Sequence, residues 1–183
     1  MNLVGNKVRI RNISRADIPL LVKWKNDPII ADFVRGGPIN TTFEIENRRY
    51  EKGLGEHDAV RLIIETLKNE AVGFISLGDI DKDNMKAEVG MLIGEKKLWH
   101  RGLGTDALVT LLRHLFIELG FHRVGLEVFE YNTRAKSVYE KIGFRVEGLQ
   151  RQGLFRNGRY YDIILMGILQ EEFLTKYQLH KTV

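Results

Sequence analysis

The stretch "LWHRGLGTDALVTLLRHLF", residues 98–116, places Gly102 and Gly104 directly before a run in which apolar residues recur at helical spacing. Glycine weakens a helix, so two glycines at a helix start need a reason. A helix N-terminus presents unpaired N–H groups and the positive end of the helix dipole, and glycine leaves that backbone unshielded. The stretch therefore indicates an anion-binding site, with a turn that needs glycine for its φ angles as the alternative.

Two common nucleotide-binding motifs do not fit this stretch. A Walker loop requires a lysine after its last glycine, and Thr105 follows Gly104 instead. "GLGTDA" matches the G-x-G-x-x-A dinucleotide pattern, which needs a strand running straight into the first glycine and an acidic residue at the end of the next strand. Eight residues separate Ile93 from Gly102, and Glu127 lies inside its expected strand. Neither a P-loop nor a Rossmann site is expected.

Composition limits the class of protein. With 183 residues, 44% of them hydrophobic, the chain suits a single domain over 1–183. The 28 basic and 24 acidic residues are interspersed, which indicates no nucleic-acid partner. Cysteine is absent and the histidines lack ligand spacing, so no metal is expected. No signal peptide or apolar membrane-length run is present, so we expect a cytoplasmic protein without a membrane partner.

The pattern around the opening stretch predicts a mixed α/β fold. Three strand-like runs at 59–67, 71–80 and 87–94 form an antiparallel meander before the glycines. The chain then alternates helix, strand and helix over about 101–119, 123–129 and 133–142, which implies a parallel crossover. We also expect a strand over 7–13, two capped helices, a terminal hairpin and a short last helix. The helix caps are Ser14 with Asp17 and Thr41 with Glu44, the hairpin covers 144–169 with its turn at Asn157 and Gly158, and the last helix lies around 171–173.

A second motif lies in "EYNTRAKSVYEKIGF", residues 130–144. Asn132 stands at the N-cap of the predicted helix, and Tyr139 lies two turns along on the face of Ala135. Alone, these residues are better explained by a helix cap and a core aromatic than by a functional site. Together with the glycine turn, N-x-x-A-x-x-x-Y-x-K-x-G-F resembles the GNAT superfamily of acetyl-CoA-dependent N-acetyltransferases. The flanking segments are most similar to the branch that holds ribosomal-protein alanine acetyltransferases and spermidine acetyltransferases.

The resemblance implies a twisted, mostly antiparallel sheet with a parallel central strand pair, flanked by helices, and acetyl-CoA as cosubstrate. In the family, backbone N–H groups of the glycine turn hold the pyrophosphate, the preceding strand pairs with pantetheine, and a tyrosine protonates the departing sulfur. Tyr139 matches that general acid, and Asn132 matches a residue that contacts the cofactor. The superfamily often has Gln or Arg where Trp99 stands. The matching cofactor-binding positions are Met91, Leu92, Ile93, Trp99, His100, Arg101, Gly102, Leu103, Gly104 and Asn132.

The sequence says less about the acceptor amine and the base that deprotonates it. A protonated amine needs a base before it attacks, and Glu88 is the candidate, with a cross-strand ion pair to Arg or Lys as the alternative role. Arg35 stands where spermidine enzymes tend to be acidic, so the acceptor stays open between a polyamine, an aminoglycoside, another small amine and a protein N-terminus. A non-catalytic acyl-CoA sensor would keep the turn without needing Tyr139. The long terminal strands are compatible with a homodimer.

Overall fold

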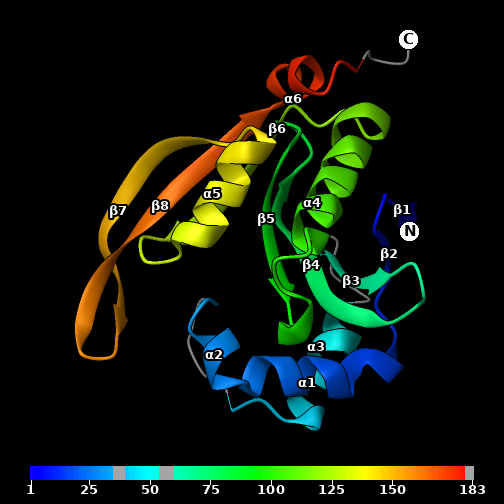
Figure 1. Ribbon diagram of the computed structural model, residues 1–183, viewed down its shortest axis with the longest axis vertical. Helices are drawn as coiled ribbons and strands as arrows, with labels where there is room; N and C mark the ends of the chain where they lie inside the picture. Colours follow the sequence, from blue (N-terminus) through cyan, green and yellow to red (C-terminus); the bar gives the residue numbers. More distant parts are fainter. Residues whose placement is uncertain (35–39, 54–59, 180–183) are drawn as a thin grey trace. The chain divides into compact units, whose positions relative to one another are not determined.

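The structure is a computed structural model that describes residues 1–34, 40–53 and 60–179 (Figure 1). It divides into two compact units, one formed by Met1–Gly78 with Met91–Leu111 and the other by Asp79–Gly90 with Leu112–Val183. Strands β4 (Ala71–Asp81) and β5 (Lys86–Ile93) contribute residues to both units. Arg35, which bears on polyamine specificity, falls outside the described residues.

Within the described ranges the strands form one eight-stranded sheet in the order β1-β2-β3-β4-β5-β6-β8-β7. β5 and β6 run parallel, with Glu88 opposite Gly125, whereas β1–β2, β2–β3, β3–β4, β6–β8 and β7–β8 are antiparallel. The predicted mixed α/β fold with one parallel pair is confirmed. The short first strand was not predicted. The remaining strands are β1 (Asn2–Val4), β2 (Val8–Asn12), β3 (Val60–Thr66), β6 (Arg123–Phe129), β7 (Arg145–Arg156) and β8 (Arg159–Leu169).

Three helices of the first unit precede β3: α1 (Ile18–Asn26), α2 (Pro28–Ala31) and α3 (Phe43–Gly53). A 3₁₀ turn at Arg15–Asp17 leads into α1, and the Asp17 carboxylate accepts hydrogen bonds from the Ser14 N–H and hydroxyl, both at 2.8 Å. This confirms the predicted cap. The α3 cap was predicted one residue too early, because the Thr42 hydroxyl accepts from the Ile45 N–H at 3.3 Å. Thr41 is instead buried.

The core of the first unit forms where α1 and α2 meet the sheet. Leu21, Trp24 and Ile30 pack with Ile63 of β3 and Leu92 of β5, all less than 8% exposed. Their removal from water is the main stabilising contribution of this unit. The core therefore holds the end of β5 in place just before the chain enters the glycine turn.

The second unit begins in the sequence with the end of β4 and includes the C-terminal part of the long helix. α4 (Leu103–Arg113) continues as a π-turn over His114–Glu118, where the Leu119 N–H donates to the His114 carbonyl at 3.0 Å. The prediction had one regular helix to Leu119. After β6 come α5 (Thr133–Ile142) and the long β7–β8 hairpin, with α6 (Gln170–Lys176) at the end of β8 (Figure 1).

The turn between β7 and β8 has the predicted chemistry, since Asn157 has a φ of +51° and Gly158 a φ of +75°. The aromatic pair Phe116 and Phe173, with ring centroids 5.3 Å apart, packs α6 onto the π-turn. In residues 1–34, 40–53 and 60–179, no helix has the length and apolarity needed to cross a membrane. The same ranges contain no group of three or more His, Asp or Glu side chains arranged to hold a metal ion.

Candidate active site

The glycine turn connects a 3₁₀ turn at Lys96–Leu98 to the first residue of α4. Two of its residues have left-handed backbone conformations, His100 with a φ of +63° and Gly102 with a φ of +77°. Glycine adopts such angles without strain, whereas His100 does so at a conformational cost. Left-handed residues among right-handed ones turn successive N–H groups toward a common point, as anion-binding nests do.

The start of α4 leaves several donors available. The Asp106 N–H makes the first bond of the helix, to the Gly102 carbonyl at 3.0 Å, so the N–H groups of Leu103 and Gly104 have no acceptor within the helix. The Trp99 N–H differs, because it donates to the Lys96 carbonyl at 3.1 Å. The six backbone N–H groups predicted to bind the pyrophosphate are those of residues 99–104. That of Trp99 already has an acceptor within the chain.

Two residues that the sequence patterns did not single out hold the turn. The Lys7 ammonium donates to the Arg101 carbonyl at 3.0 Å and lies beside Gly102, where it adds positive charge. The Asp106 carboxylate accepts from the N–H groups of Asn6, Lys7 and Val8 at 3.1, 2.7 and 3.0 Å. These contacts span about a hundred residues of sequence, so local spacing gave no signal for them.

The strand end before the turn is shaped by close packing. A side chain at Gly73 of β4 would collide with the Leu92 carbonyl, and one at Gly104 would approach the Met91 methyl group to 3.1 Å. The Trp99 indole N–H donates to the Ile93 carbonyl at 2.8 Å. The N–H groups of Gly94 and Glu95 both donate to the Val72 carbonyl, and this shared acceptor marks the irregular end of β5. The predicted strand and turn residues thus lie together in the first unit.

The second motif lies on α5, in the second unit. Asn132 is the N-cap and its side-chain oxygen accepts from the Ala135 N–H at 3.2 Å, as the spacing predicts. Tyr139 lies one turn before the helix end, with its ring centroid 5.9 Å from that of Phe144. Burial raises the pKa of Tyr139 to about 12, so its hydroxyl keeps its proton throughout the neutral range.

Glu88 lies on β5 in the second unit, with its carboxylate over β6. A side chain at Gly125 would collide with that carboxylate, so this glycine makes the room for it. Burial raises the pKa of Glu88, the negative charges of Asp79 and Glu127 add to the effect, and Arg123 opposes it. The Arg123 guanidinium lies 3.6 Å away, so the expected cross-strand cation is present, yet the carboxylate still holds a proton more readily than usual.

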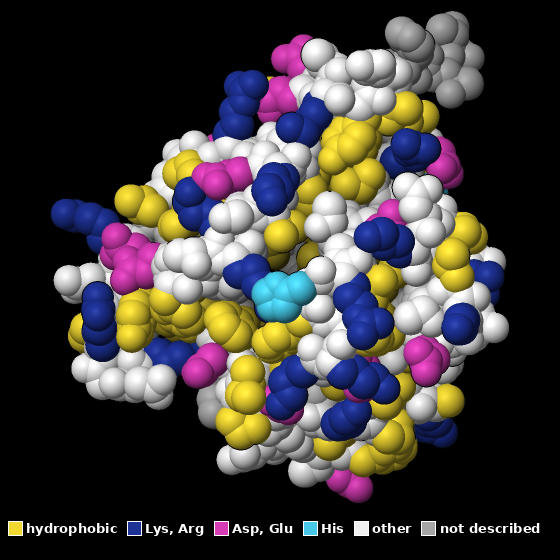
Figure 2. All heavy atoms as spheres, in the orientation of Figure 1, with side chains coloured by type: hydrophobic (Ala, Val, Ile, Leu, Met, Phe, Trp, Pro, Cys, Tyr) yellow, Lys and Arg dark blue, Asp and Glu magenta, His cyan; other side chains and the backbone are white. Residues whose placement is uncertain are grey.

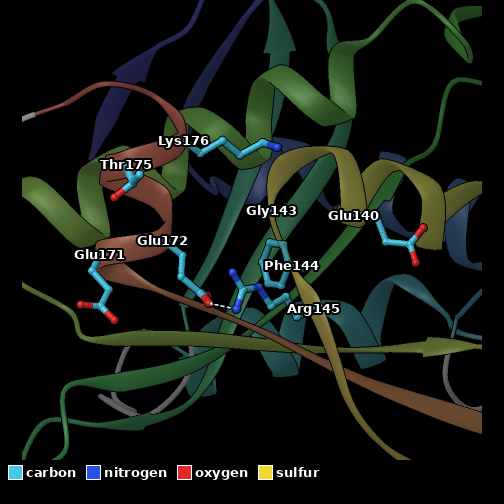
Figure 3. A pocket seen from close by; sticks show the side chains of 8 residues that line it. All are labelled: Glu140, Gly143, Phe144, Arg145, Glu171, Glu172, Thr175 and Lys176. Carbon is cyan, nitrogen blue, oxygen red and sulfur yellow. Dashed lines mark ion pairs between the residues drawn. The ribbon is translucent and has the colours of Figure 1, made fainter.

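A separate pocket of about 640 Å³ lies between the end of α5 and α6, and none of the predicted site residues lines it (Figure 3). Arg145 and Glu172 form an ion pair at 2.8 Å across it, so part of its charge is already neutralised. Its lining residues are Glu140, Gly143, Phe144, Arg145, Glu171, Glu172, Thr175 and Lys176.

Comparison with known proteins decides the family. The family described as "Acetyltransferase (GNAT) domain" matches residues 7–145, which is more than half of the chain. The chain belongs to the GNAT acetyltransferase family. An N-acetyltransferase of this family moves the acetyl group of acetyl-CoA to an amine nitrogen, so the predicted class of enzyme and the predicted cosubstrate are confirmed.

Individual relatives agree with this assignment. Spermidine N(1)-acetyltransferase of Vibrio cholerae is 26% identical over 94% of this chain and 99% of its own length. A prophage-derived N-acetyltransferase of Bacillus subtilis is 33% identical over 64% of this chain and 66% of its own. The crystal structure of the Vibrio cholerae spermidine enzyme with CoA and spermine superimposes with a TM-score of 0.86 at 26% identity, covering 91% of this chain and 98% of that one.

The turn of this GNAT enzyme fits a diphosphate. A Cβ atom at Gly102 would lie 3.0 Å from the Lys7 ammonium, so only glycine leaves the backbone and this cation open to a ligand. The unpaired N–H groups at the start of α4 and the Lys7 ammonium beside Gly102 are donors and positive charge of the kind that a pyrophosphate requires.

Proposed function

We propose that the enzyme acetylates a primary amine by direct attack of the amine on the thioester of acetyl-CoA. The observation that carries the proposal is the glycine turn, where Gly102 has a φ of +77° and precedes unpaired N–H groups at the start of α4. Its relatives include enzymes named for spermidine, which is a small-molecule amine. The acceptor is accordingly a small amine or a protein N-terminus.

We assign the pyrophosphate to the N–H groups of His100 to Gly104, with charge from Arg101 and Lys7. Met91, Leu92 and Ile93 pair with the pantetheine through their backbone, and Asn132 contacts the cofactor as its family counterpart does. Since Trp99 bonds the Ile93 carbonyl at 2.8 Å, its indole fixes the strand end on which this pairing depends. Trp99 therefore acts through its side chain more than through its N–H.

Glu88 is proposed as the general base. An amine with a pKa near 10.4 is mostly protonated at neutral pH, so a group must accept its proton before the nitrogen lone pair can attack. A carboxylate with a raised pKa is a better proton acceptor than an ordinary one, and burial raises the pKa of Glu88. Asp79 and Glu127 add negative charge that attracts an approaching ammonium group before Glu88 takes its proton.

Tyr139 is proposed as the general acid. When the carbon–sulfur bond breaks, the electron pair goes to sulfur and the developing thiolate takes the hydroxyl proton. The pKa of Tyr139, raised to about 12, keeps the hydroxyl protonated at neutral pH. The thiolate of a thiol with a pKa near 8.5 can leave without being protonated, but more slowly. The Tyr139 hydroxyl therefore accelerates turnover without being indispensable.

The test follows CoA thiol release from acetyl-CoA over spermidine, aminoglycosides and short peptides. Tyr139→Phe is expected to lower kcat about a hundredfold and to leave acetyl-CoA affinity unchanged. Tyr177→Phe is the matched control, because burial also raises the pKa of Tyr177. Absence of acetyl-CoA binding by calorimetry would overturn the proposal, and binding without turnover of any amine would identify an acyl-CoA sensor instead.

A further inference from the structure

A buried carboxylate in the first unit is surrounded by cations that neither the sequence motifs nor the comparisons single out. Glu46 of α3 is 1% exposed, and each of its oxygens accepts two hydrogen bonds. One oxygen bonds Lys25 at 2.7 Å and Arg61 at 3.4 Å. The other bonds the Thr41 hydroxyl at 2.8 Å and Arg49 at 2.5 Å. We call Lys25, Glu46, Arg49 and Arg61 the basic cluster.

The basic cluster has more positive charge than its carboxylate needs. Lys25 alone neutralises Glu46, so among the described residues Arg49 and Arg61 are in surplus. Burial lowers the pKa of Lys25 to about 8, and the neighbouring charge of Arg61 contributes to this shift. The pKa of Arg61 is also lowered, because burial and repulsion from Arg49 together outweigh the attraction of Glu46. Like charges that repel one another across a small space favour binding of an anion between them.

The surplus guanidiniums reach the surface. The side chain of Lys25 is only 9% exposed, whereas those of Arg49 and Arg61 are 45% and 32% exposed. Glu46 occupies one terminal nitrogen of each arginine, which leaves further N–H donors on both planar groups. Figure 2 shows Lys and Arg side chains gathered over the part of this face where Figure 1 draws α1 and α3.

The basic cluster lies close to the strand end that we assign to the pantetheine. Arg61 and Lys25 stand over the ring of Phe74, 5.4 and 5.9 Å from its centroid. Phe74 in turn packs against the hydrophobic cluster that contains Leu92. Phe74 therefore connects Arg61 to the apolar cluster in which the end of β5 is packed.

We propose that Arg49 and Arg61 bind an oxyanion of the acceptor, so that the substrate is an amine that also carries a carboxylate or a phosphate. This inference rests on the proposed acetyltransferase function. A guanidinium pair matches the planar, charged oxygens of such a group, whereas the same two charges repel a polyamine. Glu46 and Lys25 position the arginines and do not touch the acceptor.

The experiment compares matched acceptors. Two C-terminally amidated tetrapeptides, Ser-Glu-Ala-Ala and Ser-Gln-Ala-Ala, differ only in one carboxylate, and phosphoethanolamine with ethanolamine forms the phosphate pair. Spermidine is the polycation. In at least one of the two pairs, kcat/KM for the acidic acceptor should exceed kcat/KM for its neutral counterpart about tenfold. The pair that shows this preference identifies whether a carboxylate or a phosphate is recognised.

The variants separate recognition from stability. Arg49→Gln should raise KM for the acidic acceptor about tenfold, with kcat and the KM of the neutral acceptor unchanged. Arg48→Gln, an exposed residue next to it on α3, is the matched control and should change neither. Arg61→Gln is measured together with its thermal midpoint, because this side chain is more buried than Arg49.

Turnover with no preference for the acidic member of either pair, or preference for spermidine, would overturn this inference and leave the acetyltransferase function standing. An equal KM effect of Arg49→Gln on acidic and neutral acceptors would also overturn it. Absence of turnover with every amine would overturn both proposals.

Discussion

Glu46 and Glu88 have the same type of side chain, but the pKa of Glu46 is lowered and that of Glu88 is raised. Burial opposes ionisation of both carboxyl groups. At Glu46, hydrogen bonds from Lys25, Thr41 and Arg49 outweigh burial and hold the pKa below its usual value. At Glu88, one cation 3.6 Å away does not outweigh burial, to which Asp79 and Glu127 add, and the pKa rises.

The difference indicates which carboxylate is suited to a structural role and which is suited to proton transfer. A fully ionised, fully hydrogen-bonded group is poorly suited to proton transfer, because protonation would cost all of its contacts. A half-buried carboxylate with few donors gains a proton at low cost. We therefore expect substitutions at Glu46 to act on folding and those at Glu88 to act on turnover.

The largest expected effect is on stability. Glu46→Gln leaves Lys25, Arg49 and Arg61 without a counter-charge, so the free energy of unfolding should fall by about 3 to 5 kcal/mol. Urea unfolding followed by circular dichroism measures it. Glu44→Gln, exposed on the same helix, should leave the free energy of unfolding nearly unchanged. Equal stability of the two variants would show that the buried carboxylate is not structural.

An intermediate effect is expected on turnover at Glu88. Glu88→Gln keeps the shape of the side chain but cannot accept a proton, so kcat should fall about a hundredfold with little change in stability. Because the folded-state pKa of Glu88 is raised, wild-type kcat should decline with falling pH at a midpoint above that of an ordinary glutamate. The variant should lack this decline, and a persistent acid limb would assign the base elsewhere.

The smallest effects concern the neighbours that set the pKa of Glu88. Arg123→Gln removes an opposing cation and should move the acid limb of kcat to higher pH. Glu127→Gln removes a like charge and should move it to lower pH. Shifts in the same direction, read from pH profiles at saturating acceptor, would contradict the electrostatic account.

Much of the fold followed from local patterns. The Asn132 cap and the Asn157–Gly158 turn depend on residues within a few positions, so spacing was sufficient to predict them. The cap at Thr41 was wrong because its hydroxyl donates to the Glu46 carboxylate five residues further on, and the Thr42 hydroxyl accepts from the helix instead. The cytoplasmic location, the single domain and the homodimer stay predictions.

The sequence by itself determined most of the order of elements, the glycine turn and the family, because each is recorded in residues close together along the chain. Only the tertiary structure decided that Lys7 and Asp106 hold the turn, and that three cations share one carboxylate at Glu46. Their charges act through space across contacts between distant segments, and burial that no local pattern contains shifts the pKa values of Glu46, Lys25 and Arg61.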